Sequence, residues 1–256
     1  MPAFKLSKWY MDCVTDSGDA SIGYIGVADW GLIHLHYSSL LESTAGQIRQ
    51  QYSLRERGEP QIKEATIGWK AGAFGIDAVW HSDSAGLRET IFESDQGSVE
   101  WHCLMPCARV QMQHRSGLGY VEHLTMTIAP WKIPIRHLRW GRFTSASDWA
   151  VWIDWEGDFS RRMVYLNGKP VTTSLVEDGQ LKFDNGDLLT TSDSIVLRDG
   201  PLGTTALSAI PGVEKTLPAR LLSVSERKWR SRARLTCADS RTVEGWAIHE
   251  RVSWPR

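Results

Sequence analysis

Turn-forming residues recur along the whole chain and leave little room for long helices. Clusters rich in Gly, Asp, Asn and Pro separate short segments in which Val, Ile, Thr, Tyr and Trp are common. This alternation is typical of antiparallel strands joined by hairpins, so the sequence predicts an all-β sandwich or barrel. A short helix is expected only at Leu40–Ile48. The turn clusters are Asp16–Asp19, Glu56–Pro60, Ser82–Gly86, Asp95–Gly97, Asn167–Pro170, Glu177–Gly179 and Asn185–Gly186.

The length and the charge balance restrict both the architecture and the partners. The 256 residues, 42% of them hydrophobic, are enough for one large all-β domain or two small ones with a real core. The formal net charge of −1 provides no global field that would attract nucleic acid or an anionic membrane. Any partner must therefore be recognised at a local site.

Nothing in the sequence indicates secretion or insertion into a membrane. The first residues lack the apolar core of a secretory signal, and no later stretch has the apolar run needed to cross a bilayer. We therefore expect a cytoplasmic protein without a transmembrane segment. Its cysteines lack the spacing of a C-x-x-C pair and are expected to be reduced thiols. They are Cys13, Cys103, Cys107 and Cys237.

A weak internal repeat divides the chain into two similar halves. Ala108-Arg109-Val110 precedes Gly119 by about the interval that separates Ala233-Arg234-Leu235 from Gly245. A Trp next to a Pro closes each unit, as Pro130-Trp131 and Trp254-Pro255. Two barrels or half-barrels in tandem would explain this repeat. The predicted domains are residues 1–129 and 130–256, with the boundary in a Pro-rich link.

The most informative single segment is Gly119–Ile128. If it is a strand, side chains alternate between its faces, so Tyr120 and Glu122 point the same way. A carboxylic acid that donates a proton near pH 7 must stay neutral, which an apolar cavity achieves by penalising the charged form. A phenol can hold that acid in position. The alternative is a structural carboxylate paired with Arg139 or Arg142.

Short motifs lie along most of the chain, at residues 9–18, 99–106, 119–122, 138–143 and 245–252. They resemble motifs of the carotenoid 1,2-hydratase (hydroxyneurosporene synthase) and AttH-like double-lipocalin family, which includes natural-product cyclases. The resemblance implies two lipocalin-like domains that hold an apolar ligand. It also implies that the acid two residues after the motif tyrosine, here Glu122, donates a proton to a carbon–carbon double bond.

Other acids and aromatic residues are candidates for the same cavity. Asp154 beside Trp152 is a second possible catalytic acid, and Asp12 beside Tyr10 is a third, although either could be a strand-end carboxylate that faces solvent or pairs with an Arg. Aromatic faces can stabilise the cation that protonation creates. The residues expected to contact the substrate are Trp101, Trp140, Trp152, Tyr10, His34 and His36.

Two further patterns have simple structural explanations. His34 and His36 share a strand face like a pair of metal ligands, but no third ligand has a distinctive spacing, so we predict no metal site. A packed or solvent-facing pair is favoured, and proton shuttling is the alternative if they face the cavity. The basic segment Arg227–Arg234 could bind nucleic acid, but alternation favours a solvated strand face.

Three functions remain open. The first is an enzyme that acts without a cofactor on an apolar unsaturated small molecule, by acid-assisted hydration, cyclisation or isomerisation. The second is a pericyclase that accelerates ring closure by folding its substrate, without an acid. The third is a carrier that binds a hydrophobic ligand unchanged. The sequence identifies neither the ligand nor the oligomeric state.

Overall fold

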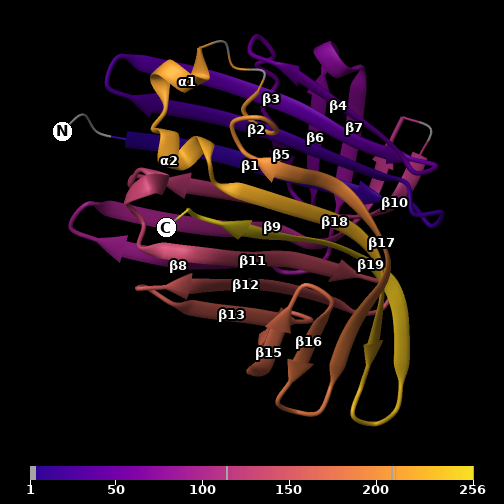
Figure 1. Ribbon diagram of the computed structural model, residues 1–256. Coiled ribbons are helices and arrows are strands. Elements are labelled where there is room, and N and C mark those ends of the chain that lie inside the picture. Colours follow the sequence, from indigo (N-terminus) through magenta and orange to yellow (C-terminus); the bar gives the residue numbers. More distant parts are fainter. Residues whose placement is uncertain (1–3, 114, 209, 211, 256) are drawn as a thin grey trace. The chain divides into compact units, whose positions relative to one another are not determined.

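The computed structural model describes residues 4–113, 115–208, 210 and 212–255, and these form two antiparallel sheets. The predicted all-β fold of antiparallel strands is confirmed. The chain divides into two compact units, Met1–Lys132 (unit 1) and Ile133–Arg256 (unit 2), each with one sheet (Figure 1). That each half is a separate domain, with a boundary after residue 129, stays a prediction.

Unit 1 contains a sheet in the order β4-β3-β2-β1-β10-β9-β7-β6-β5, and β8 also pairs with β9. The first strand, β1, therefore lies between β2 and β10, which come from opposite ends of the unit. The strands are β1 (Phe4–Val14), β2 (Ala20–Trp30), β3 (Ile33–Thr44), β4 (Gln47–Ser53), β5 (Gln61–Lys63), β6 (Thr66–Ala71), β7 (Ile76–His81), β8 (Leu87–Ser94), β9 (Gly97–Met112) and β10 (Arg115–Met126). Two 3₁₀ turns follow β6 and β10, at Gly72–Phe74 and Pro130–Lys132.

Unit 2 repeats this plan in the order β14-β13-β12-β11-β19-β18-β17-β16-β15. Its strands are β11 (Ile135–Thr144), β12 (Trp149–Gly157), β13 (Arg161–Leu166), β14 (Lys169–Pro170), β15 (Thr173–Glu177), β16 (Gln180–Phe183), β17 (Leu188–Pro201), β18 (Ser225–Thr236) and β19 (Thr242–Ser253). Its helices are α1 (Val213–Thr216) and α2 (Ala219–Leu222). Within the described residues, no helix has the length and apolar character that crossing a membrane requires.

The residues of the internal repeat occupy matching places in the two sheets. Ala108 on β9 lies opposite Gly119 on β10, and Ala233 on β18 lies opposite Gly245 on β19. Both glycines lie in close contact with the main chain of a neighbouring strand. A Cβ atom on Gly119 would lie 2.0 Å from the carbonyl oxygen of Asp12, and one on Gly245 would lie 2.2 Å from that of Thr144. Glycine is needed at both places because the strands approach too closely for a side chain.

The helix predicted at Leu40–Ile48 is wrong. These residues form the end of β3, a two-residue turn and the start of β4, with Thr44 opposite Gln47. Ala45 and Gly46 have positive φ angles of 49° and 80°, as a tight hairpin turn requires. Asn167-Gly168, which was recognised as a turn, has the same conformation, with φ angles of 50° and 80°.

Alternation gives the unit 1 sheet two distinct faces. Val121 and Met11 belong to the apolar core cluster of this unit, so their side chains define the core face. Tyr120, Glu122 and Tyr10 alternate with them and lie on the opposite face. The core cluster consists of Met11, Cys13, Ile25, Leu40, Ile67, Trp69, Ala71, Ile76, Ala78, Trp80, Met105, Ala108, Val110, Met112 and Val121.

Candidate functional site

Glu122 and Tyr120 form a buried pair on β10, as their alternation predicts. The Tyr120 hydroxyl donates to Oε2 of Glu122 at 2.7 Å, and their side chains are 0% and 7% exposed. Burial raises the pKa of Tyr120 well above its usual value, with further contributions from Cys103 and Glu122. The phenol therefore keeps its proton and acts as a donor to the carboxyl group.

Trp101 on β9 is a second donor to the same carboxyl oxygen. Its indole Nε1 lies 2.6 Å from Oε2 of Glu122. Cys103, two residues further along β9, lies directly opposite Glu122, and its thiol is hydrogen-bonded with Tyr120. Burial raises the pKa of the Cys103 thiol well above its usual value, so the thiol is neutral. Glu122 therefore has two neutral donors and an adjacent neutral thiol.

A second tyrosine–acid pair lies beside the first. On β1, the Tyr10 hydroxyl donates to Oδ2 of Asp12 at 2.9 Å, and both residues are buried. The strands are antiparallel, so Tyr10 lies opposite Glu122 and Asp12 lies opposite Tyr120. The two tyrosine rings meet edge to face at 5.9 Å. The charges of Glu122 and Asp12 both act on Cys103, which places the two carboxyl groups in one electrostatic environment.

This four-residue group, Tyr10, Asp12, Tyr120 and Glu122, is the candidate functional site. Sequence reasoning named all four residues but treated Asp12 only as a third, separate acid. The repeated pattern of a tyrosine two residues before an acid, at 10–12 and 120–122, was the signal that could have joined them. The pattern does not predict that β1 pairs with β10, because this pairing joins residues about 110 positions apart.

The two arginines suggested as partners of Glu122 make contacts within unit 2. Arg139 donates to Oε1 of Glu156 at 2.7 Å and lies 3.5 Å from Asp178. Arg142 is fully buried and donates to the Thr144 hydroxyl at 2.9 Å and to the carbonyl oxygen of Trp246 at 3.0 Å.

Asp154 has a different kind of partner from Glu122. It lies on β12 in unit 2 and is 2% exposed. Arg162 donates hydrogen bonds to both of its carboxylate oxygens, with N–O distances of 3.0 and 3.3 Å. Such a fork of two charge-assisted bonds fixes the orientation of the carboxylate. This is the structural alternative that the sequence left open for Asp154. Its proposed catalytic role stays a prediction.

The aromatic candidates separate into two groups. Tyr10 belongs to the candidate site, and Trp101 donates a hydrogen bond to Glu122 of that site. Trp140 and Trp152 lie on adjacent strands of unit 2, where Trp152 is part of the apolar core and covers Gly141. The ammonium group of Lys228 lies 5.4 Å from the ring centroid of Trp140. That these two tryptophans contact a substrate stays a prediction.

His34 and His36 are neighbours on β3, with ring centroids 4.9 Å apart. His34 is exposed and pairs with Asp29 at 2.6 Å. Burial and then the charge of Arg57 lower the pKa of His36. Among the described residues, no group of three or more His, Cys, Asp and Glu side chains has an arrangement that could hold a metal ion.

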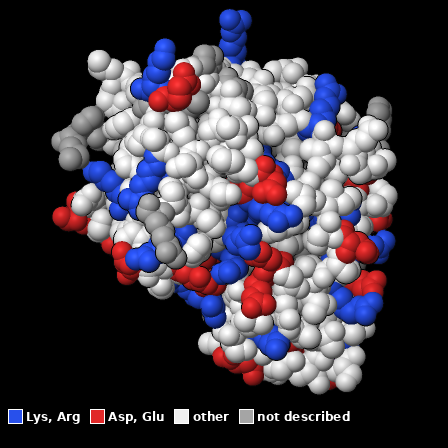
Figure 2. Space-filling view, in the orientation of Figure 1, with Lys and Arg blue, Asp and Glu red and all other residues white. Residues whose placement is uncertain are grey.

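The basic segment of β18 is not a uniformly solvated face. Arg232 and Arg234 are exposed as predicted, but Lys228 and Arg230 are buried, at 1% and 7% exposed. Lys228 forms an ion pair with Glu250, and Arg230 lies 4.7 Å from the ring of Trp246. The solvated-face prediction is therefore wrong for these two residues. On the face shown in Figure 2, acidic and basic side chains are interspersed.

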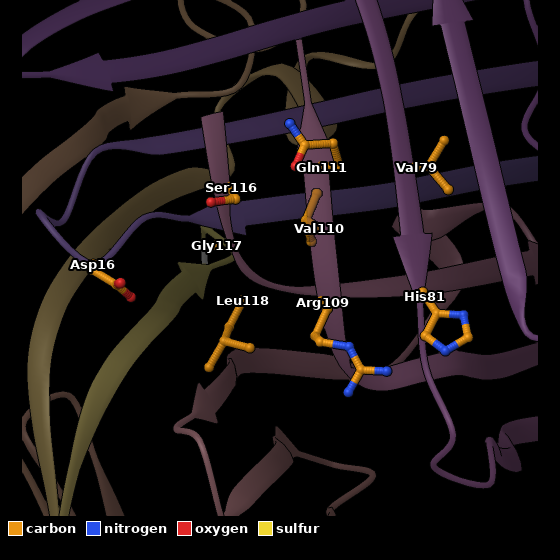
Figure 3. A pocket seen from close by; sticks show the side chains of 9 residues that line it. All are labelled: Asp16, Val79, His81, Arg109, Val110, Gln111, Ser116, Gly117 and Leu118. Atoms are coloured by element: carbon orange, nitrogen blue, oxygen red, sulfur yellow. The ribbon is translucent and has the colours of Figure 1, made fainter. Parts of the chain in front are cut away.

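A surface groove of about 570 Å³ lies elsewhere in unit 1. Figure 3 shows Arg109 and His81 side by side, in agreement with their direct pairing between β9 and β7. Asp83 forms an ion pair with Arg109 at 3.3 Å, and its other oxygen lies 3.4 Å from Nε2 of His81. The groove is lined by Asp16, Val79, His81, Arg109, Val110, Gln111, Ser116, Gly117 and Leu118, and therefore by none of the four site residues.

Comparison with known proteins gives a match at the level of structure. No family model and no curated protein sequence matches the chain. The structure of CghA superposes with a TM-score of 0.62 at 10% identity, over 98% of this chain and 88% of CghA. Kievitone hydratase from Nectria haematococca gives 0.55 at 9% identity, over 98% and 89%. An AttH-like protein from Nitrosomonas europaea gives 0.52 at 8% identity, over 99% and 93%. This chain therefore has the double-lipocalin fold that these structures share.

Proposed function

We propose that the protein is an enzyme that adds a proton to a carbon–carbon double bond of an apolar small molecule, without a cofactor. The observation that carries this proposal is the buried carboxyl group of Glu122, which is held by two neutral donors, Tyr120 and Trp101. Kievitone hydratase has the same fold, which supports the choice of hydration among acid-assisted reactions.

The hydrogen bonds fix where the proton of a neutral Glu122 would lie. Both donors point at Oε2, and an oxygen that accepts two hydrogen bonds is the carbonyl oxygen of a protonated carboxyl group. The transferable proton is therefore on Oε1. Once it leaves, the same two bonds stabilise the carboxylate that forms. They favour the charged product more than the neutral acid, which is the differential stabilisation that lowers a barrier.

Asp12 is the candidate base that takes a proton from water. Glu122 and Asp12 are diagonal neighbours across the β1–β10 ladder, a relation that separates residues by about 7–8 Å. Two buried carboxyl groups this close together hold one negative charge more easily than two. We assign the neutral form to Glu122 and the charged form to Asp12. In hydration, Glu122 protonates one alkene carbon, and water attacks the neighbouring carbon as it loses a proton to Asp12. The product gains C–H and C–OH bonds, and solvent returns the protons to their starting places.

The decisive experiment is turnover in D₂O of kievitone and of a linear polyene alcohol such as farnesol, followed by mass spectrometry. Wild-type protein should incorporate one deuterium at carbon. Glu122→Gln keeps the shape but has no acidic proton, so it should lose at least about 100-fold in rate. Glu93→Gln, at an exposed position on β8, is the matched control and should match wild type.

Asp12→Asn separates hydration from isomerisation. This variant retains the acid of Glu122 but lacks the base for water, so deuterium should enter carbon while the alcohol product is lost. If Glu122→Gln turns a substrate over at the wild-type rate, the acid mechanism is wrong, and ring closure by substrate folding takes its place. If the compounds are recovered unchanged from wild-type protein that binds them, the protein is a carrier.

A further inference from the structure

The core face of the unit 1 sheet carries a second group of polar side chains. Trp9, His102 and His123 alternate with the residues of the candidate site, so they lie on the other face of the same strands. They form one row across the sheet, in which His123 lies directly opposite both Trp9 and His102. Trp9 also packs against the apolar core cluster. The core face therefore changes from apolar to polar along the strands.

Specific contacts order this row. The imidazole of His123 stacks on the indole of Trp9 with centroids 4.4 Å apart and planes at 25°. Its Nε2 lies 2.7 Å from the hydroxyl oxygen of Ser7. Ser7, Trp9, His102 and His123 are all intermediate in exposure. A half-exposed imidazole that is fixed on two sides can be reached by a small molecule without a change in the fold.

Unit 2 contains a similar histidine stack in a closed form, but the stack uses the other neighbouring strand. Trp229 and Ser231 lie on β18, the counterpart of β9, whereas Trp9 and Ser7 lie on β1, the counterpart of β11. His249 follows Gly245 by the same four residues that separate His123 from Gly119. It stacks on Trp229 with centroids 5.0 Å apart and planes at 18°, and its Nε2 lies 2.9 Å from the hydroxyl oxygen of Ser231. His249 is only 4% exposed. His102 therefore occupies the place in unit 1 that Trp229 occupies in unit 2, and the histidine of unit 1 is partly exposed where that of unit 2 is buried.

The electrostatics around Ser7, Trp9, His102 and His123 favour an uncharged ligand. Burial lowers the pKa of both imidazoles, assisted by Arg88 for His102 and by His102 for His123, so both are neutral at pH 7. The charge of Glu59 opposes the shift of His123. A basic residue therefore acts on His102 and an acidic residue acts on His123, with opposite signs. Neutral imidazole and serine each donate and accept, which matches a hydroxyl group, and the indole provides a face for an aromatic ring.

We propose that Ser7, Trp9, His102 and His123 form a second binding site, separate from the candidate functional site, for an uncharged hydroxylated aromatic compound. The ligand's hydroxyl group forms hydrogen bonds with the imidazoles of His102 and His123. Its ring lies over the row that Trp9, His102 and His123 form. This inference does not rest on the proposed function, because the Glu122 group is on the other face of the sheet.

Three probes with one ring system test the ligand class: 2-naphthol, 2-methoxynaphthalene and 2-naphthoate, titrated at pH 7.5 by calorimetry. The imidazole nitrogen signals of ¹⁵N-labelled protein are recorded in parallel. We expect 2-naphthol to bind about 5–10-fold more tightly than the ether, which cannot donate a hydrogen bond. It should shift the signals of His102 and His123. Tighter binding of 2-naphthoate would overturn the assignment of an uncharged ligand.

Variants test the location. His123→Phe keeps a ring against Trp9 but loses the hydrogen bonds, and should weaken 2-naphthol binding to the level of the ether. Ser7→Ala is the alternative if that variant does not fold, and should weaken binding about 5-fold. His34→Phe, at an exposed position, and Glu122→Gln should bind as wild type does. No binding of 2-naphthol at millimolar concentration, or equal binding by wild type and His123→Phe, would refute the site.

Discussion

Glu122 and Asp154 are both buried carboxyl groups, but they have different kinds of hydrogen-bond partner. Neutral donors hold Glu122, whereas a guanidinium group holds both oxygens of Asp154. The two bonds to Asp154 come from one charged group and reach both of its oxygens, whereas the two bonds to Glu122 come from neutral groups and meet at one oxygen. At the scale of single residues, the two carboxyl groups therefore differ in the chemical type of their neighbours.

The buried His249 gives a prediction for stability against pH. Burial and then Lys228 lower its pKa from 6.5 to about 4. The folded protein thus binds the proton less readily than the unfolded chain does. This residue imposes no penalty above pH 6.5, and the free energy of unfolding falls as the pH drops from 6.5 to 4, by about 3 kcal/mol in total.

Urea unfolding of His249→Gln between pH 7 and pH 5 checks this prediction. Glutamine keeps a partner for Ser231 but does not titrate, so stability should depend less steeply on pH than in wild type. His137→Gln, at an exposed position on β11, is the control and should retain the wild-type dependence. Identical slopes for wild type and His249→Gln would show that folding does not change the pKa of this histidine.

At the scale of strands, alternation correctly predicted which side chains share a face. It did not predict whether that face is buried or solvated. Tyr120 and Glu122 share a face, as do Lys228 and Arg230. A basic strand face was expected to be solvated, yet Lys228 is buried in an ion pair with Glu250. The period of a strand reports which side chains point the same way. It does not report what covers that side, which depends on residues far away in the sequence.

The glycines of the internal repeat are expected to control strand spacing. A Cβ atom at Gly119 or Gly245 would overlap a neighbouring carbonyl oxygen, so Gly119→Ala and Gly245→Ala should each lower the free energy of unfolding by about 1–3 kcal/mol. Gly119→Ala should in addition reduce turnover, because the displaced carbonyl belongs to Asp12.

Urea denaturation of the three variants Gly119→Ala, Gly245→Ala and Gly72→Ala measures the effect. Gly72 is the matched control, because a Cβ atom there would meet nothing within 4 Å. Its replacement should change stability by less than about 0.5 kcal/mol. An equally small effect at Gly119 would mean that the strands can move apart without cost.

At the scale of the whole molecule, each unit contains its own sheet and apolar core cluster. The residues after β10 belong by their contacts to unit 1. The ring of Trp131 meets Phe4 with centroids 5.8 Å apart and Trp30 at 5.0 Å. A fragment that ends at residue 129 loses these contacts, whereas one that ends at residue 132 keeps them.

Expression of residues 1–132 and of residues 1–129 tests whether unit 1 is a domain. We expect the longer fragment to unfold cooperatively on heating and to be more stable by about 1–3 kcal/mol, the usual value of two aromatic contacts. Circular dichroism and thermal melts provide the measurement. A longer fragment without β structure would show that unit 1 does not fold by itself.

The sequence alone determined the all-β class, the hairpin turns and the side chains that share a face, because each depends on residues close together in the chain. It also identified Glu122 and Tyr120 as a pair. Local reasoning failed at Leu40–Ile48, where two residues with positive φ angles form a hairpin instead of a helix. Only the tertiary structure decided that β1 pairs with β10, which adds Asp12 and Tyr10 to the site, and that Trp101 is the second donor. These partners come from separate strands, and their contacts depend on a register that no local pattern specifies.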